Sequence, residues 1–292
     1  MKKTYQNIIV VGRSNLAEKC LKMAMQMYPA CAVRYYKASE QGTVKSALTR
    51  IGDAEVRSVS RQEIMEELAA ERTDSLVLSI CNPYLFPERV LDNPALMLVN
   101  VHHALLPRHR GRNVEGWTVF MGDTVAGITW HEIAAEVDAG RIICQREMKM
   151  TVGRDAIPAV KVYQKLNELV LESFPEVLTA CMEGTVRMTS MPASDEPIHY
   201  AKDVPGNGYL DPCWPADTIC QFLCAMDYGV LYAMGRPKLR LGERTFTWKR
   251  YEWTPADHAE GVELLEAEKE IRLYREGMEF RLHRIAELEE TT

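Results

Sequence analysis

The 292-residue sequence has no run of about 18 apolar residues, which excludes an ordinary membrane-spanning helix. Its amino end lacks an apolar stretch followed by a small-residue cleavage site, so we expect a cytoplasmic protein without a secretory leader. The eight cysteines form no CxxC pair. Cys220 and Cys224 lie one helical turn apart, but neither a histidine nor a second cysteine pair completes a metal set. Unpaired thiols in a reducing compartment and no metal are therefore predicted.

Long basic runs are also missing. Lys and Arg gather in short stretches such as 34–37, 108–110 and 249–250, and the formal net charge is −6. Proteins that hold RNA neutralise many phosphates with basic side chains. The charge balance therefore disfavours nucleic acid as a partner, although a local basic patch would keep tRNA as an alternative.

Two familiar motifs are absent. The turn at Gly12 does not form a GxGxxG fingerprint, so no NAD site is inferred. No second histidine follows His131-Glu132 at the spacing of a zinc-protease helix. A hydrophobic content of 47% with 26% charged residues is typical of a globular protein. The length allows one large or two modest domains, and either can bury a sizeable core.

Apolar strands alternate with amphipathic helices in the first half of the chain. We predict buried strands at 8–11, 75–80 and 96–101 and a further strand at 31–36. Helices are predicted at 14–27 and 61–70, the first capped by Ser14 or Asn15. This alternation is typical of a parallel sheet in a Rossmann-like α/β domain. Sites in such sheets lie at the carboxyl ends of strands, where Asn100 and His102 fall.

The second half of the chain differs in pattern. A long amphipathic helix is predicted at 157–182, and the composition of 191–197 is that of a linker. We therefore predict a catalytic domain over 1–190 and a smaller domain over 198–292, with a helix at 215–225 and a hairpin at 238–248. At 262–285, apolar residues seven apart fit a helix, whereas alternation around Glu276-Gly277 fits a hairpin. Glycine costs about 1 kcal/mol inside a helix, so strands are favoured and the domain is mainly β.

Three polar residues suggest acyl transfer to an amine. Asn100 and His102 are separated by one residue, so they point the same way at the end of a strand. An asparagine amide can donate a hydrogen bond to a tetrahedral oxyanion, and a histidine can exchange the proton that the attacking amine loses. Asp138, in a glycine turn, can orient the imidazole or take the proton.

A longer series of motifs surrounds these residues, in the order Asn100-x-His102, Leu105-Leu106-Pro107, Arg110-Gly111, Gly127-Ile128-Thr129 and Asp138-Ala139-Gly140. In order and spacing the series resembles the signature of the formyltransferases that use 10-formyltetrahydrofolate, with Ile128 where valine is usual. The match covers roughly residues 75–150. The resemblance implies that Asn100, His102 and Asp138 are catalytic and that 10-formyltetrahydrofolate is the formyl donor. It also implies an OB-like barrel over 198–292.

The resemblance extends to the ligand-binding residues. The loop at 81–87 would hold the pterin of the folate, mostly through backbone groups, although an ordinary proline-bounded loop is equally compatible with the sequence. The implied folate-binding residues are Asn82, Tyr84, Leu85, Phe86, Ile128 and Val137. Arg110, Trp117 and His131 are expected to contact the acceptor substrate.

Three classes of function remain open. The first is formyl transfer to a primary amine of a small metabolite: an amino sugar nucleotide or an amino acid, free or carrier-bound. The second is hydrolysis of the formyl donor, which the same three residues would serve. The third is formylation of aminoacylated tRNA or a purely binding role. The negative net charge and the short 36–44 region argue against tRNA. Transfer to a small amine is our leading hypothesis, and exposed strand edges leave a homodimer open.

Overall fold

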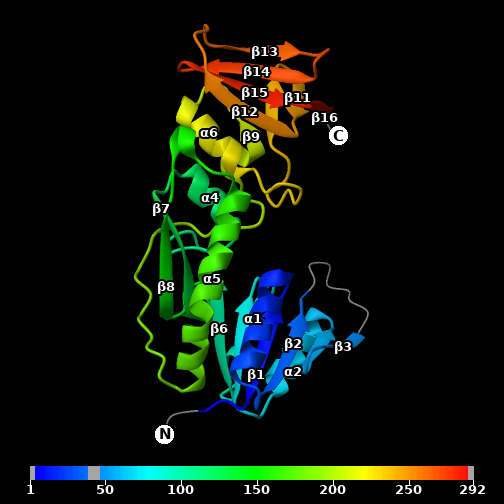
Figure 1. The fold of residues 1–292 in the computed structure, drawn as a ribbon, viewed down its shortest axis with the longest axis vertical. Helices are drawn as coiled ribbons and strands as arrows, with labels where there is room; N and C mark the ends of the chain where they lie inside the picture. The colour runs from blue at the N-terminus through cyan, green and yellow to red at the C-terminus, as the bar shows by residue number, and fades with distance from the viewer. Residues whose placement is uncertain (1–3, 39–46, 289–292) are drawn as a thin grey trace. The chain divides into compact units, whose positions relative to one another are not determined.

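The computed structural model describes residues 4–38 and 47–288, so most of the 36–44 region lies outside the described residues. The chain forms two compact units (Figure 1). The first comprises Met1–Arg110, Gly127–Glu147 and Leu166–Glu196, and the second comprises Gly111–Ala126, Met148–Lys165 and Pro197–Thr292. Each unit is therefore discontinuous in sequence, and a division into consecutive domains at 1–190 and 198–292 stays a prediction.

An eight-stranded sheet in the order β3-β4-β2-β1-β5-β6-β7-β8 organises the first part of the chain. Its strands are β1 Asn7–Gly12, β2 Ala32–Lys37, β3 Ala47–Ile51, β4 Ala54–Ser58, β5 Ser75–Ile80, β6 Leu96–His102, β7 Val125–Glu132 and β8 Ile142–Lys149. The neighbouring strands β4, β2, β1, β5 and β6 pair in parallel, whereas β3 runs antiparallel to β4 and β7 antiparallel to β6. Every residue of β5 is buried, as a strand covered on both faces requires. The predicted Rossmann-like parallel sheet is confirmed.

Four helices accompany these strands: α1 Ser14–Met27, α2 Arg61–Ala70, α3 Glu88–Leu91 and α5 Ala159–Met182. α1 lies against the sheet beside β1 and β2 (Figure 1). α2 begins with a capping box, because the Ser60 hydroxyl accepts from the Glu63 N–H while the Glu63 carboxylate accepts from the Ser60 N–H. The expected side-chain cap of α1 was wrong: Arg13 occupies the N-cap position and makes no side-chain capping bond. None of the described helices is both long and apolar enough to cross a bilayer.

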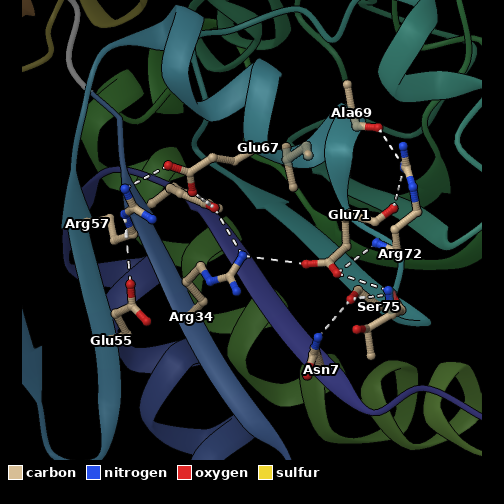
Figure 2. Close-up of polar contacts among 12 residues, drawn as sticks. Asn7, Arg34, Glu55, Arg57, Glu67, Ala69, Glu71, Arg72 and Ser75 are labelled. Carbon is tan, nitrogen blue, oxygen red and sulfur yellow. Dashed lines mark hydrogen bonds and ion pairs between the residues drawn. The ribbon is translucent and has the colours of Figure 1, made fainter.

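A polar network links α2 to the strands of this sheet (Figure 2). Arg34 Nη1 lies 3.6 Å from Glu71 Oε2, and Arg57 Nη2 lies 2.7 Å from Glu67 Oε1. Asn7 Nδ2 donates to Ser75 Oγ at 3.2 Å, which joins the amino ends of β1 and β5. Sites in such folds lie at the opposite, carboxyl ends of the strands, so we assign the Asn7–Ser75 bond to stability.

The second unit is mainly β, as predicted. It contains α4 Val114–Phe120, η1 Gly153–Asp155, η2 Pro205–Gly208 and α6 Ala216–Ala225. One sheet, in the order β16-β11-β10-β9, is formed by β9 Tyr209–Leu210, β10 Lys238–Leu241, β11 Arg244–Thr247 and β16 Ala286–Leu288. The other, in the order β12-β15-β14-β13, is formed by β12 Arg250–Pro255, β13 Gly261–Leu265, β14 Glu270–Arg275 and β15 Met278–His283.

The ambiguous segment at 262–285 is a set of strands, which confirms the favoured interpretation. Glu276 and Gly277 have φ of 47° and 72° and form the tight turn between β14 and β15. Two successive residues with positive φ match the twist of a hairpin and do not fit a helix. Ile271 and Phe280 then point into the apolar core of this unit.

Candidate active site

Asn100 and His102 lie on the last residues of β6. Since strand side chains alternate between faces, the two side chains share one face of the sheet. β7 runs antiparallel beside them, and its register places His131 opposite Asn100 and Thr129 opposite His102. The pairing of these two strands therefore adds two polar side chains to the predicted pair.

His102 is buried, and both of its ring nitrogens face polar atoms. Nε2 lies 2.8 Å from the carbonyl oxygen of His109. A carbonyl only accepts, so Nε2 carries the proton of the neutral ring. Nδ1 lies 3.5 Å from Asp138 Oδ2. The geometry leaves Nδ1 as the nitrogen that can take a proton, with a carboxylate beside it to stabilise the resulting imidazolium.

The environment of His102 lowers its pKa, chiefly because burial disfavours the charged ring. The Asp138 carboxylate and the His109 carbonyl act in the opposite direction, while His131 and His103 lower the pKa further. A histidine whose pKa lies below its usual value is neutral at physiological pH. It can therefore accept a proton from a reacting amine.

His131 connects Asn100 to Asp138. Its Nδ1 lies 2.8 Å from the Glu132 carbonyl and therefore donates, so Nε2 is an acceptor in the neutral ring. Asn100 Nδ2 donates to this Nε2 at 3.1 Å, and Asp138 Oδ1 lies 3.6 Å from the same nitrogen. The structure thus brings the three predicted catalytic residues together. His131, predicted to contact the acceptor, lies buried among them and fixes which way the Asn100 amide faces.

A short loop between β7 and β8 presents Asp138. Asp138 has a φ of 50°, a left-handed conformation that aspartate tolerates better than most residues. The base of the loop is closed by Arg141, whose guanidinium makes two bonds of 2.7 and 2.8 Å to the Glu132 carboxylate. Gly140 packs directly on the Glu132 carbonyl. These contacts explain why glycine follows Asp138 in the motif.

Replacing Gly140 with alanine is expected to displace Asp138. A Cβ built at Gly140 would lie 1.8 Å from the Glu132 carbonyl oxygen, which is backbone and cannot rotate away. The loop must therefore shift, and a misplacement of about 1 Å can cost on the order of 100-fold in rate. We expect kcat to fall by about 10- to 100-fold.

Steady-state kinetics on purified Gly140→Ala checks this expectation. Gly261→Ala is a suitable control, because a Cβ at Gly261 meets no atom within 4 Å. A Gly140→Ala variant as fast as the control would show that the position of this loop does not govern turnover.

Thr129 and Gln145 hold the segment that follows His102. Thr129 Oγ1 donates to the Ala104 carbonyl at 2.6 Å and accepts from the Leu106 N–H at 3.0 Å. Gln145 Nε2 donates both to Thr129 Oγ1 and to the Leu106 carbonyl, each at 2.9 Å. Sequence reasoning gave Thr129 no role beyond its motif and missed Gln145, because β8 carries no distinctive spacing.

The predicted folate-binding residues lie in varied environments. Asn82 shapes its loop, since its Oδ1 accepts from the Tyr84 N–H at 3.0 Å and its Nδ2 donates to the Tyr84 carbonyl at 3.2 Å. Tyr84 and Phe86 are partly buried against the core of the first unit, whereas Leu85 is 63% exposed. Ile128 is fully buried in β7, and Val137 is half-buried next to Asp138. Their contacts with folate stay a prediction.

The other two predicted acceptor residues also have defined partners. Arg110 Nη1 lies 2.6 Å from Glu136 Oε1. Trp117, in α4 of the second unit, stacks on the His199 ring with centroids 4.5 Å apart. Among the residues that the structure describes, no group of three or more His, Cys, Asp or Glu side chains is arranged to hold a metal ion.

Residues 2–178 match the sequence model of the family described as formyl transferase. GDP-perosamine N-formyltransferase of Brucella melitensis is 22% identical over 223 residues, which cover 75% of this chain and 84% of that protein. Methionyl-tRNA formyltransferase of Streptococcus pneumoniae is 30% identical over 174 residues. That match covers 58% of this chain and only 54% of the relative.

A solved structure shares the fold. The N-formyltransferase from Helicobacter canadensis, determined in complex with folinic acid and dTDP-3-aminofucose, superposes with a TM-score of 0.70. The alignment covers 96% of this chain and 99% of that one at 13% sequence identity. At this identity the likeness concerns the fold alone.

Proposed function

Because the chain belongs to the formyl transferase family, we propose that it moves a formyl group from 10-formyltetrahydrofolate to the amine of a nucleotide-linked amino sugar. The observation that carries this proposal is the closed cluster of Asn100, His131, Asp138 and His102. It combines an oriented amide donor with a neutral imidazole and a carboxylate, which acyl transfer to an amine requires.

The geometry supports a specific division of roles. The neutral amine attacks the formyl carbon, and a C–N bond forms to give a tetrahedral oxyanion. One N–H of Asn100 is held by His131, and the other donates to the oxyanion. His102 Nδ1 takes the proton that the amine loses, and Asp138 stabilises the imidazolium. The bond between the formyl carbon and N10 of the folate then breaks, and the proton passes to N10.

The donor site in this proposal is the 81–87 loop. Asn82 holds the loop in shape, which leaves backbone groups for the pterin. The exposed side chain of Leu85 and the half-buried rings of Tyr84 and Phe86 offer the apolar contacts that a flat heterocycle needs. Val137, which precedes Asp138, and Ile128, which precedes Thr129 in β7, complete the proposed folate set.

The choice of an amino sugar as acceptor draws on the relatives. The GDP-perosamine enzyme matches over most of its length, and the Helicobacter canadensis structure holds an amino sugar nucleotide. The methionyl-tRNA enzyme matches over about half of its length. A net charge of −6 also disfavours an acceptor as large and as anionic as tRNA. Trp117 remains a proposed acceptor contact. Arg110 and His131 were also predicted to contact the acceptor, but Arg110 pairs with Glu136 and His131 with Asn100. A cytoplasmic location and a homodimer remain predictions.

An acceptor panel tests the proposal. Tetrahydrofolate formation from 10-formyltetrahydrofolate would be followed optically with GDP- and dTDP-linked amino sugars, free amino acids and methionyl-tRNA. We expect turnover with an amino sugar nucleotide only. Turnover without any amine would instead indicate a hydrolase, and turnover only with methionyl-tRNA would overturn the small-molecule acceptor.

A further inference from the structure

Arg110 and Glu136 form an ion pair directly beside the catalytic cluster. Arg110 follows His109, whose carbonyl holds His102 Nε2, and Glu136 lies in the loop that presents Asp138. Arg110 Nη1 lies 2.6 Å from Glu136 Oε1. The Arg110 side chain is only 15% exposed, whereas the Glu136 side chain is 64% exposed. A mostly buried guanidinium needs an anionic partner, and Glu136 supplies it.

These contacts close a ring around the imidazole. On one side, His102 Nε2 bonds to the His109 carbonyl; on the other, Nδ1 faces Asp138. The Arg110–Glu136 pair joins the chain next to His109 to the chain next to Asp138. The pair therefore fixes the distance between the His109 carbonyl and Asp138, and the His102 imidazole lies between these two groups. The Glu132–Arg141 pair holds only the base of the same loop.

We propose that the Arg110–Glu136 ion pair is a latch that positions Asp138 against His102. Arg110 and Glu136 are positioning residues in this role, and they act on the reaction through Asp138. The effect on turnover rests on the function proposed above, but the effect on the protonation of His102 does not. The predicted contact between Arg110 and the acceptor competes with this positioning role, because an acceptor anion could bind Arg110 only by displacing Glu136.

The titration of His102 reports the latch directly. The groups that face this ring are Asp138 from the loop, His131 from β7, and His103 and the His109 carbonyl from the segment at the end of β6. Asp138 raises the pKa of His102, so a loop that moves away lowers it. Ring nitrogen signals followed by NMR across pH, assigned with a His102→Gln variant, give the midpoint without any substrate.

Arg110→Gln separates positioning from a direct charge effect. Removing a nearby cation would by itself favour the protonated ring and move the His102 midpoint to higher pH. Breaking the ion pair lets Asp138 move away from His102, and this moves the His102 midpoint to lower pH by on the order of half a pH unit. We expect Arg110→Gln and Glu136→Gln both to lower the midpoint, and Arg110→Lys to restore it. In an Asp138→Asn background the lowering through Asp138 should be absent, and only the direct charge effect of each change should remain.

Glu176→Gln is the matched control, since Glu176 is 67% exposed and pairs with Arg146 in the same unit. It should leave the midpoint unchanged. With an active acceptor, we expect the two latch variants to lose about 10-fold in kcat. A midpoint that rises or stays constant in Arg110→Gln overturns the latch. Absence of turnover with every amine would count against the proposed function and leave the titration result standing.

Discussion

Replacing His102 with glutamine is expected to lower kcat by about 100- to 10,000-fold, the usual contribution of a positioned proton acceptor. Glutamine keeps a donor for the His109 carbonyl but offers no nitrogen that takes a proton beside Asp138. The amine proton would then have to pass to water, while folate binding should change little.

The same account fixes the direction of the pH dependence. Burial lowers the pKa of His102, and its Nδ1 must be unprotonated to accept the amine proton. kcat/KM should therefore fall as the pH drops through this lowered pKa, and that acidic limb should vanish in His102→Gln.

His258→Gln provides the control for this variant. His258 is exposed in the second unit, and its ring nitrogen donates to the Ala259 carbonyl. Measuring both kcat and the thermal unfolding temperature distinguishes the loss of a proton acceptor, which lowers kcat alone, from loss of the fold, which lowers both. A His102→Gln enzyme that stays folded and works within about twofold of the wild type would exclude His102 from proton transfer.

Removing the Asn100 amide should have the second largest effect. A single oxyanion donor is typically worth about 100- to 1,000-fold in kcat, so we expect Asn100→Ala to lose this amount. Asn100→Asp should lose a similar amount, because a carboxylate has the shape of the amide but donates no hydrogen bond and repels the oxyanion. The loss should appear in kcat and not in KM for the donor, since the bond strengthens only in the transition state.

Asn7→Ala is the control for the asparagine. Asn7 Nδ2 also makes one hydrogen bond, to Ser75 Oγ, at the amino end of the same sheet (Figure 2). It should lower stability slightly and leave kcat unchanged. If Asn100→Ala and Asn7→Ala had the same kcat, the oxyanion would have to be stabilised elsewhere.

Local sequence patterns predicted the main features of the sheet. Continuous apolar runs marked β1 and β5, which are buried strands, and helical spacing marked α2. The hairpin at Glu276-Gly277 was predictable because glycine disfavours a helix and permits positive φ. The start of α1 was not predictable in this way. Serine usually favours the N-cap position, but here Arg13 is the N-cap residue and Ser14 is the first residue of the helix.

The catalytic cluster could be predicted only in part. Asn100 and His102 share a face because they are two residues apart on one strand. The place of His131 depends on the register between β6 and β7, which no local pattern specifies. The contact between Glu136 and Arg110 depends on the path of a loop, and so does the contact between Asp138 and His102. Long-range contacts of this kind require the fold.

The most direct test of the central claim is to follow an isotopically labelled formyl group. The wild-type enzyme would be given labelled 10-formyltetrahydrofolate and a nucleotide-linked amino sugar, and the products would be analysed by mass spectrometry. Our account predicts that the label appears on the amine of the sugar, and that the transfer is almost abolished in His102→Gln. Label released only as formate, or transfer that is equally fast in His102→Gln, would contradict it.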